Sequence, residues 1–283
     1  LMASDLSGQE LFLETYPMPS SDQTISDCLI RYIDAAVVRL PESPHGLLGI
    51  CLGIHGVVHH NRIIFLPRGS YANLDLITPL HEHFGVPVLM ENEANLSALA
   101  EHQYHNTGEM IFISVHNGIG IGIITHDQLM KGKHGFAGEF GHSIIQVRGR
   151  TCPCGNKGCL EQYASERALF EELSDLKGYP VDETRFSELM AGHDPDAHRT
   201  IETFIDYMSI AVNNLMNAYN PDIIVLNCIF NRYCPDLCEQ ITEHMQNRMQ
   251  PYCRLVPSRI PDTAVLKGGV HLIQKAFLYP NQL

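Results

Sequence analysis

The sequence has little positive charge and no long apolar segment. Its 19 Lys and Arg residues stand against 32 Asp and Glu residues, so the net charge is −13, and we expect no nucleic-acid-binding surface spread over this chain. No stretch approaches the roughly 18 consecutive apolar residues that a membrane-spanning helix needs. The start also lacks the basic and apolar regions of a signal peptide, and neither internal repeats nor low-complexity tracts occur. We therefore expect a cytoplasmic protein whose DNA contacts, if it has any, come from outside this chain.

The chain is long enough for two domains or one large one. It has 283 residues, of which 45% are hydrophobic and 18% charged. This balance is typical of globular proteins with a sizeable core, not of disordered chains. The first residue is a leucine followed by a methionine, and this start indicates a fragment of a longer protein.

Apolar runs alternate with amphipathic helical patterns along the chain, as in layered α/β proteins. The expected strands are residues 47–54, 86–90, 109–116, 119–125, 222–227 and 254–257. The expected helices are residues 22–40, 74–84, 160–173, 197–219, 237–249 and 269–278, with one more from about residue 94. Asn117-Gly118 between two apolar runs is a strong hairpin signal.

Two α/β lobes are the expected domain organisation. Composition marks no sharp boundary, and the division is placed near Thr107-Gly108. The first lobe is then residues 1–107, completed by the C-terminal helix at residues 269–283, and the second lobe is residues 108–268.

Three of the nine cysteines are crowded into the segment Cys152-Pro-Cys154-Gly-Asn-Lys-Gly-Cys159. In a chain expected to be cytoplasmic, this spacing indicates a metal site rather than disulfides. Gly155 and Gly158 permit the positive φ angles of a turn on which three thiolates can converge. We therefore expect a structural zinc site here, with one further ligand.

The fourth zinc ligand is expected to be His142, the nearest upstream histidine. A strand over residues 143–147 can return the chain from it to the cysteines, and three cysteines with one histidine form a closed structural zinc set. His134 and His126 are alternatives for this ligand, and three reduced thiols without metal are the alternative for the whole loop. Two further cysteines at helical spacing are interpreted as core or surface thiols rather than a second site, namely Cys234 and Cys238.

With these residues in view, the chain resembles the ROK family, named for repressors, open reading frames and sugar kinases. Ala137-Gly-Glu-Phe-Gly-His142, followed by residues 152–165, matches the family's signature almost throughout. Glu91-Asn-Glu-Ala-Asn95 corresponds to its Glu-Asn-Asp-Ala-Asn sugar and catalytic segment, and Gly53-Ile-His-Gly56 to its Gly-x-Pro-Gly turn. The resemblance runs from about residue 5 to the C-terminus. It implies a two-lobed α/β architecture, the actin-like, ribonuclease-H-like ATPase fold, with sugar bound in the cleft between the lobes.

The resemblance also implies a set of sugar ligands. By position, the family's sugar-hydroxyl ligands fall on Asn92, Glu93, Glu139, His142 and Glu161. Their amide, carboxylates and imidazole can together donate to and accept from a polyol such as a hexose. His142 would serve twice, with one ring nitrogen on zinc and the other fixed as an N–H donor toward the sugar. As alternatives, Glu139 and Glu161 are solvated surface carboxylates, and Asn92 is the N-cap of the helix that follows it, a role compatible with sugar binding.

Three features of a ROK kinase are damaged in this chain. The first phosphate turn, Asp-x-Gly-x-Thr, has no counterpart, because the chain opens at what resembles the second strand of the fold, with residues 5–8 at its turn. The second, Gly-Thr-Gly-Ile-Gly, appears as His116-Asn-Gly-Ile-Gly120, without the threonine hydroxyl and with an imidazole where the backbone must approach a phosphate. Glu93 stands at the position of the aspartate base, and its extra methylene displaces the carboxylate by about 1 Å, which can cost on the order of 10²-fold in rate. Glu93 is therefore a vestigial base position, and a hairpin explains the glycines at residues 118–122 equally well.

Kinase-like lobes with a damaged phosphate site are typical of the regulator branch of the family, the NagC/XylR-type repressors, which carry a helix-turn-helix before these lobes. We therefore expect the effector-binding and dimerisation region of a sugar-responsive transcriptional regulator, with no catalytic residue. It would bind a sugar or sugar phosphate, contact DNA only through a missing N-terminal domain, and form a homodimer. Residues 197–219 are candidates for the dimer interface, although lobe core explains their apolar spacing as well. The alternatives are an ATP-dependent sugar kinase and a module that docks a protein such as a sugar-transport component.

Overall fold

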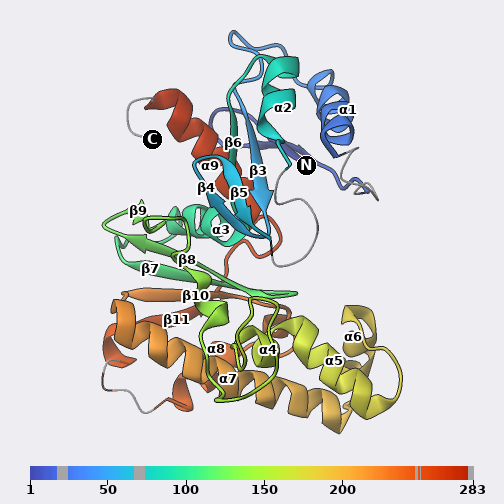
Figure 1. Ribbon diagram of the computed structural model, residues 1–283, viewed down its shortest axis with the longest axis vertical. Coiled ribbons are helices and arrows are strands. Elements are labelled where there is room, and N and C mark those ends of the chain that lie inside the picture. The colour runs from blue at the N-terminus through green and yellow to red at the C-terminus, as the bar shows by residue number, and fades with distance from the viewer. Residues whose placement is uncertain (18–24, 67–73, 246–247, 249, 280–283) are drawn as a thin grey trace. The chain divides into compact units, whose positions relative to one another are not determined.

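The computed structural model describes residues 1–17, 25–66, 74–245, 248 and 250–279. The expected α/β class is confirmed, and the chain forms two compact units that each combine strands with helices (Figure 1). Unit 1 consists of Leu1–Ala100, Lys133–Phe136 and Asp262–Leu283, and unit 2 of Glu101–Gly132 and Ala137–Pro261. The sequence analysis placed the two boundaries between the lobes after residues 107 and 268, whereas the units change after residues 100 and 261. In the described part of the chain, no helix is both long enough and apolar enough to cross a membrane.

Unit 1 contains short strands that pair two by two. The antiparallel pairs are β1 (Met2–Ser4) with β2 (Glu10–Leu13) and β4 (Val57–His59) with β5 (Arg62–Phe65), and the parallel pair is β3 (Ile50–Ile54) with β6 (Val88–Asn92). The helices that begin in this unit are α1 (Ile25–Val37), α2 (Ile77–Phe84), α3 (Glu93–His102) and α9 (Ala264–Leu278). α9 packs against β3 (Figure 1). The carboxyl ends of β3 and β6 therefore lie side by side, where the 53–56 turn and the start of α3 emerge.

Unit 2 is built on a five-stranded sheet with the order β11-β10-β7-β8-β9. Its strands are β7 (Met110–Val115), β8 (Ile119–Thr125), β9 (Gln128–Leu129), β10 (Ile223–Asn227) and β11 (Arg254–Pro257). β10 runs parallel to both of its neighbours, β7 and β11. β8 runs antiparallel to both of its neighbours, β7 and β9. The predicted β7–β8 hairpin is confirmed, but three residues connect it, and neither Asn117 nor Gly118 has the positive φ of a two-residue Asn-Gly turn.

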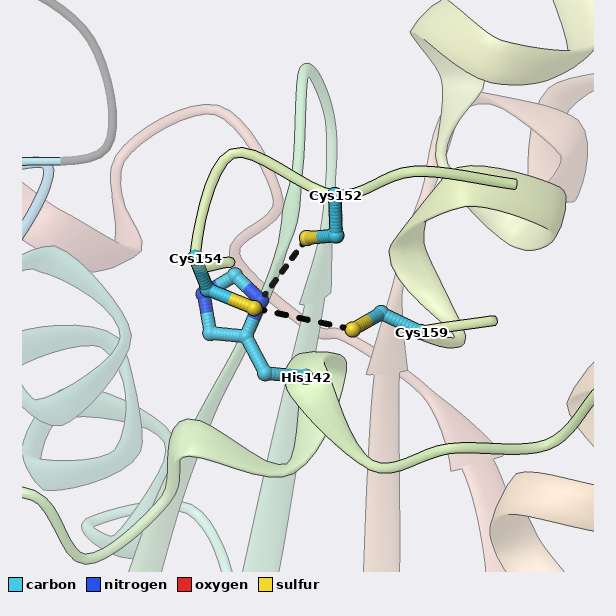
Figure 2. A group of neighbouring side chains, drawn as sticks. All are labelled: His142, Cys152, Cys154 and Cys159. Carbon is cyan, nitrogen blue, oxygen red and sulfur yellow. Dashed lines mark hydrogen bonds between the residues drawn. The ribbon is translucent and has the colours of Figure 1, made fainter. Parts of the chain in front are cut away.

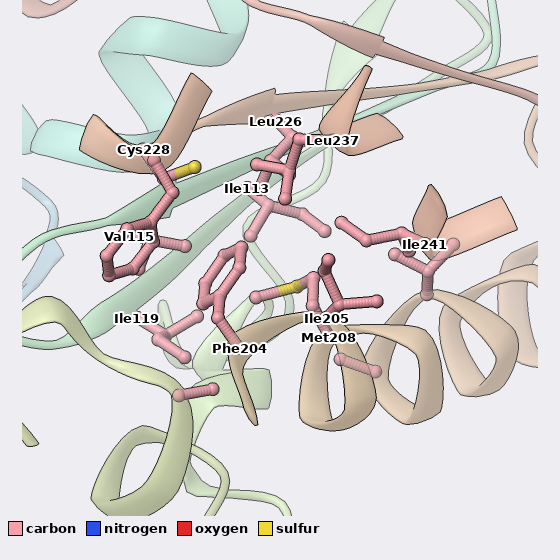
Figure 3. Close-up of a cluster of buried hydrophobic side chains, with 14 of the residues drawn as sticks. Ile113, Val115, Ile119, Phe204, Ile205, Met208, Leu226, Cys228, Leu237 and Ile241 are labelled. Carbon is pink, nitrogen blue, oxygen red and sulfur yellow. The ribbon is translucent and has the colours of Figure 1, made fainter. Parts of the chain in front are cut away.

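The core of unit 2 lies between this sheet and two of its helices, α7 (Pro195–Tyr219) and α8 (Leu237–Glu243). Asp194 caps the start of α7 by accepting from two backbone N–H groups, and Asn220 ends it in the left-handed conformation. The α7 face carries Phe204, Ile205 and Met208 toward buried side chains of β7, β10 and α8 (Figure 3). The helix expected at residues 197–219 is thus confirmed, and this face of it is occupied by unit 2 core.

The expected helix at residues 160–173 is wrong as a single helix. It is divided into α4 (Glu161–Ala164) and α5 (Glu166–Lys177), because Ser165 adopts an extended conformation and its side chain accepts from the Ala168 N–H as an N-cap. α8 ends at residue 243, short of the expected 249, and residues 246, 247 and 249 lie outside the described part, as do residues 22–24 of the first expected helix. The strand expected at the start of the chain, with its turn at residues 5–8, is present as β1. The sequence missed α6 (Glu183–Ala191), the strands β2, β4, β5 and β9, and the short 3₁₀ turns η4 (Ile229–Arg232) and η5 (Gln250–Tyr252).

A buried carboxylate joins the two ends of unit 2. Glu101 is fully buried, and its Oε1 accepts from the Ser258 hydroxyl and from the backbone N–H groups of Arg259 (2.8 Å) and Ile260 (3.3 Å). Its Oε2 lies 3.4 Å from His105 Nε2. Burial lowers the pKa of His105, with Glu101 opposing this shift. Glu101 therefore fixes the segment that follows β11 to the start of the unit.

Candidate functional site

The four predicted zinc ligands come together in unit 2. One ligand atom from each of His142, Cys152, Cys154 and Cys159 lies within 4.8 Å of all the others (Figure 2). Cys154 Sγ is 3.6 Å from Cys159 Sγ, and Cys152 Sγ is 3.5 Å from His142 Nδ1. A tetrahedral zinc ion with Zn–S of about 2.3 Å and Zn–N of about 2.0 Å requires sulfur–sulfur separations of about 3.8 Å and sulfur–nitrogen separations of about 3.5 Å. The donor set and its spacing therefore fit a metal ion, and neither His134 nor His126 belongs to the group.

The prediction of a strand over residues 143–147 is wrong, and the cysteine loop closes without it. Only an isolated bridge pairs Ile144 with Cys159 there, and the N–H groups of Ile145 and Gln146 both donate to the Gly158 carbonyl. The positive φ angles predicted for the two loop glycines are confirmed. The Leu160 N–H also donates to the Ser143 carbonyl at 2.9 Å, so backbone hydrogen bonds rather than a strand hold the loop closed.

The pKa values of the three loop thiols are shifted in different directions. Burial raises the pKa of Cys152 and of Cys159. Burial also acts to raise the pKa of Cys154, but the hydrogen bonds from the Asn156 N–H and the neighbouring thiols outweigh it, and the pKa is lowered. Because zinc binds thiolates, metal binding at this site would displace protons.

His142 presents its two ring nitrogens to different partners. Nδ1 faces the sulfurs, and Nε2 lies 3.5 Å from Glu139 Oε2. With Nδ1 on a metal, Nε2 must carry the proton, as the sequence predicted for a nitrogen turned toward a ligand. Burial, with a smaller contribution from the charge of Glu161, raises the pKa of Glu139 against the opposing effect of His142. Glu139 thus lies close to the ring nitrogen of His142 that does not face the sulfurs.

Glu139 and His142 are placed by a turn that lies directly on the sheet. They begin and end η3 (Glu139–His142), a 3₁₀ turn that packs against β8. Gly138, just before it, has φ of +91°, and a Cβ there would be 2.0 Å from the Ile121 carbonyl oxygen. Only glycine permits this approach, which explains the Ala-Gly-Glu segment of the signature.

Glu161 is buried at the start of α4 and is not a solvated surface carboxylate. The residue is 8% exposed. Its Oε1 lies 3.0 Å from Cys152 Sγ, accepts from Gln162 Nε2 at 2.9 Å, and is 3.5 Å from His142 Nδ1. In unit 2 the structure therefore brings Glu139, His142 and Glu161 to one place.

Asn92 and Glu93 lie in unit 1, at the end of β6 and the start of α3. The predicted N-cap role of Asn92 is confirmed, since its Oδ1 accepts from the N–H groups of Ala94 (2.8 Å) and Asn95 (3.1 Å). Its Nδ2 donates to the Gly56 carbonyl at 2.8 Å. These bonds use one of the two amide N–H groups and leave the other for a ligand.

The structure adds His55, which the sequence reading did not single out. Its Nδ1 lies 3.5 Å from Glu93 Oε1 in unit 1. The signal available in the sequence was its place in the Gly53-Ile-His-Gly56 turn, where the family pattern has proline. Strand order alone does not reveal the contact, which depends on β3 and β6 ending side by side.

The turn at His116–Gly118, which corresponds to the second phosphate turn, is surrounded by carboxylates. Glu161 Oε2 would lie 3.2 Å from a Cβ added to Gly118, and Glu166 Oε2 is 3.6 Å from His116 Nδ1. The Asn117 carbonyl accepts from the Arg167 guanidinium at 3.2 Å. A phosphate at this turn would lie near two carboxylates and one guanidinium, so the carboxylates outnumber the cation there.

An open pocket of about 830 Å³ lies next to this turn in unit 2. Asn117 and Phe170 belong to its lining, and Arg167 is the cation among the lining residues. Its lining carboxylates are Glu166, Glu171, Asp175, Asp182 and Glu183. The pocket is therefore acidic and disfavours a polyphosphate.

Comparisons with known proteins agree with these features. A family model described as the ROK family matches residues 1–276. The xylose repressor of Bacillus spizizenii is 33% identical over 97% of this chain and 74% of that protein. The DNA-binding transcriptional dual regulator NagC of Escherichia coli is 29% identical over 78% of this chain and 58% of that protein.

Solved structures with the same fold include both regulators and kinases. A ROK family transcriptional regulator, a homologue of the E. coli Mlc protein, matches with a TM-score of 0.81 and 25% identity over 96% of this chain and 74% of that chain. A ROK family glucokinase from Streptomyces griseus matches with a TM-score of 0.82 and 22% identity over 95% of this chain and 93% of that chain, a likeness of fold alone. The expected actin-like fold is thus confirmed. The chain belongs to the ROK family.

Proposed function

We propose that this chain is the effector-binding region of a sugar-responsive ROK transcriptional regulator, and that it binds sugar without phosphorylating it. The observation that carries this proposal is the carboxylate of Glu166, 3.6 Å from His116 in the turn where a kinase would hold phosphate. Phosphoryl transfer depends almost entirely on positioning and charge stabilisation. Relatives of this chain are named xylose repressor and N-acetylglucosamine repressor. The kinase alternative is supported less, by kinase structures at 22% and 25% identity, whereas a relative named a repressor is 33% identical.

Five residues are proposed as hydroxyl ligands of the sugar, namely Asn92, Glu93, Glu139, His142 and Glu161. Each has polar capacity that its described contacts do not exhaust, such as the second N–H of Asn92 and the Nε2 of His142. Carboxylates that accept and amide or imidazole groups that donate can replace the water around several hydroxyls. Their assignment as sugar ligands rests on the match to the family's motifs.

Zinc is the proposed metal at His142, Cys152, Cys154 and Cys159. Three thiolates and one imidazole form a closed tetrahedral set, which is a structural set because it leaves no open position. Zinc on Nδ1 would fix Nε2 of His142 as the donor. The metal would thereby orient a proposed sugar ligand.

The proposed effector class is a neutral aldose, and D-xylose is the first compound to test because relatives at 33% and 31% identity are named xylose repressors. The wider panel includes D-glucose, N-acetylglucosamine and hexose 6-phosphates. Calorimetry should show saturable binding of at least one of these sugars. Binding should be weakened at least tenfold by Glu161→Ala and by His142→Ala, while Glu188→Ala, at an exposed carboxylate of α6, should leave it unchanged. Binding unchanged in the first two variants would refute the ligand assignment, and no binding by any sugar would refute the function.

Two statements about partners belong to the same proposal. DNA contact is assigned to a segment outside the 283 residues, because the net charge of −13 disfavours a DNA surface on them. A homodimer is proposed because helix-turn-helix regulators match two half-sites with two-fold symmetry, and a cytoplasmic location follows from a DNA-bound role. Sedimentation should show a dimer at micromolar concentration when the chain is joined to its DNA-binding segment, and a monomer would contradict the proposal.

A further inference from the structure

The interruption between α4 and α5 brings Arg167 back to Gln162. On one continuous helix, side chains five residues apart point in directions about 140° apart and do not meet. Ser165 breaks the helix and caps α5, and Arg167 lies in the first turn of the new helix. Its Nη2 donates to Gln162 Oε1 at 3.2 Å. The same guanidinium donates to the Asn117 carbonyl at 3.2 Å and to Glu171 at 2.7 Å, so three contacts fix its position in unit 2.

Arg167 determines which way the side-chain amide of Gln162 faces. A guanidinium only donates hydrogen bonds, so the amide oxygen lies toward it and the amide nitrogen lies on the other side. Nε2 of Gln162 is accordingly 2.9 Å from Glu161 Oε1 and 3.6 Å from Cys152 Sγ. Gln162 is 8% exposed and the Arg167 side chain 14%, so water competes little for these bonds. When Cys152 is a thiolate, both acceptors are anions, which strengthens the hydrogen bonds from the amide.

These bonds hold one oxygen of Glu161 and leave the other uncovered. Oε1 is the oxygen that faces the amide and the sulfur. No described residue donates to Oε2, and Oε2 is not among the buried side-chain atoms that lack a hydrogen-bond partner in the described chain, so it is open to solvent. A Cβ at residue 118 would lie 3.2 Å from Oε2, and Gly118 leaves that space empty. Oε2 is therefore the oxygen of Glu161 that a ligand can reach.

We propose that Arg167 and Gln162 are positioning residues that hold Glu161 for one sugar hydroxyl. Arg167 orients the amide of Gln162, the amide holds Oε1 of Glu161, and Oε2 accepts from the hydroxyl. Arg167 and Gln162 act through Glu161 and not on the sugar itself. The inference rests on the proposed sugar-binding function and adds to it the way in which one of the ligands is held.

The test is calorimetry with D-xylose, D-glucose and N-acetylglucosamine on Arg167→Met and Gln162→Met, which remove the polar groups and keep an unbranched side chain. Each variant should weaken binding of the best of these sugars by about 3- to 10-fold, the effect of one hydrogen bond. Arg185→Met is the matched control, because Arg185 pairs with Glu188 on the exposed face of α6, and it should bind as the wild type does. Zinc content should be unchanged in all three variants. If Arg167→Met does not fold, Gln162→Met carries the test.

Monodeoxy analogues of the best sugar separate positioning from general damage to the site. One analogue lacks the hydroxyl that Glu161 accepts from, and Arg167→Met and Gln162→Met should bind this analogue as well as the wild type does. Every other analogue should show the full loss. Added to Glu161→Ala, either substitution should change the sugar affinity by less than about twofold, because the group through which it acts is already removed.

Three results would overturn the positioning role of Arg167 and Gln162. They are equal losses for all analogues, loss of zinc in both variants, and losses that multiply with that of Glu161→Ala. Binding by the wild type that neither variant weakens would also overturn it and leave the proposed function standing. No binding of any sugar by the wild type would overturn both proposals.

Discussion

Gly138→Ala should destabilise unit 2 and displace the proposed sugar ligands of η3. An alanine at the left-handed φ of +91° costs about 1–2 kcal/mol. The Cβ would also lie 2.0 Å from the Ile121 carbonyl oxygen, so that η3 must move from β8 by about 1 Å, and overpacking of this kind adds about 1–3 kcal/mol. The sum is about 2–5 kcal/mol, a large part of the usual stability of a domain. Glu139 and His142 would move with the turn.

The assay is urea unfolding together with zinc content and sugar calorimetry. Gly178→Ala is the control, because Gly178 also has a positive φ, +74°, but nothing lies within 4 Å of an added Cβ. It should cost only the about 1–2 kcal/mol of the strained φ, without the overpacking, and leave sugar binding unchanged. If Gly138→Ala proved as mild as Gly178→Ala in stability and in binding, the close approach of η3 to β8 would not position the site.

Three further variants test other parts of the structure. Cys154→Ala should abolish stoichiometric zinc in elemental analysis, whereas Cys234→Ala should keep it, and protein purified without chelator that contains no zinc would refute the site. Lys177→Met should lower the urea midpoint at pH 7, because Lys177 donates a hydrogen bond to Asp194 and lowers the pKa of that carboxyl. The stabilisation is present above the ordinary pKa of aspartate and is lost as the pH falls through the lowered pKa of Asp194. An equal effect of the substitution at pH 7 and pH 2 would contradict the pairing. Glu101→Ala removes the acceptor of three hydrogen bonds from the segment after β11 and should cost about 3–5 kcal/mol in urea unfolding, with a loss below 1 kcal/mol as the refuting result.

Elements with a continuous pattern could be predicted from the sequence. The apolar spacing of residues 197–219 and the Asn220-Pro221 stop predicted α7 within a few residues. The helix expected at residues 160–173 failed because its apolar spacing continues across Ser165, while the break depends on a side-chain cap that local periodicity does not reveal. Periodicity therefore located α7 and the segment of α4 and α5, but not the interruption at Ser165.

The zinc ligands could be predicted because three of them lie within one short loop. Their spacing limits how they can converge, and His142 was predicted as the nearest upstream histidine, although the strand expected between it and the cysteines is only an isolated bridge. The contact of Glu101 with Ser258 joins residues 157 positions apart, and the contact of His55 with Glu93 depends on the pairing of β3 with β6. Such contacts are set by tertiary packing, so that spacing along the chain carries no signal for them.

The most direct test of sugar binding without phosphorylation is the rate of ADP release by protein saturated with its best-binding sugar and Mg-ATP. The carboxylates beside the His116–Gly118 turn and the acidic pocket next to it predict no more ADP than in the sample without sugar. Calorimetry on the same preparation must show that the sugar is bound. Sugar-dependent turnover of about 1 s⁻¹ or more, within the usual range of enzymes, would contradict the account and identify a kinase.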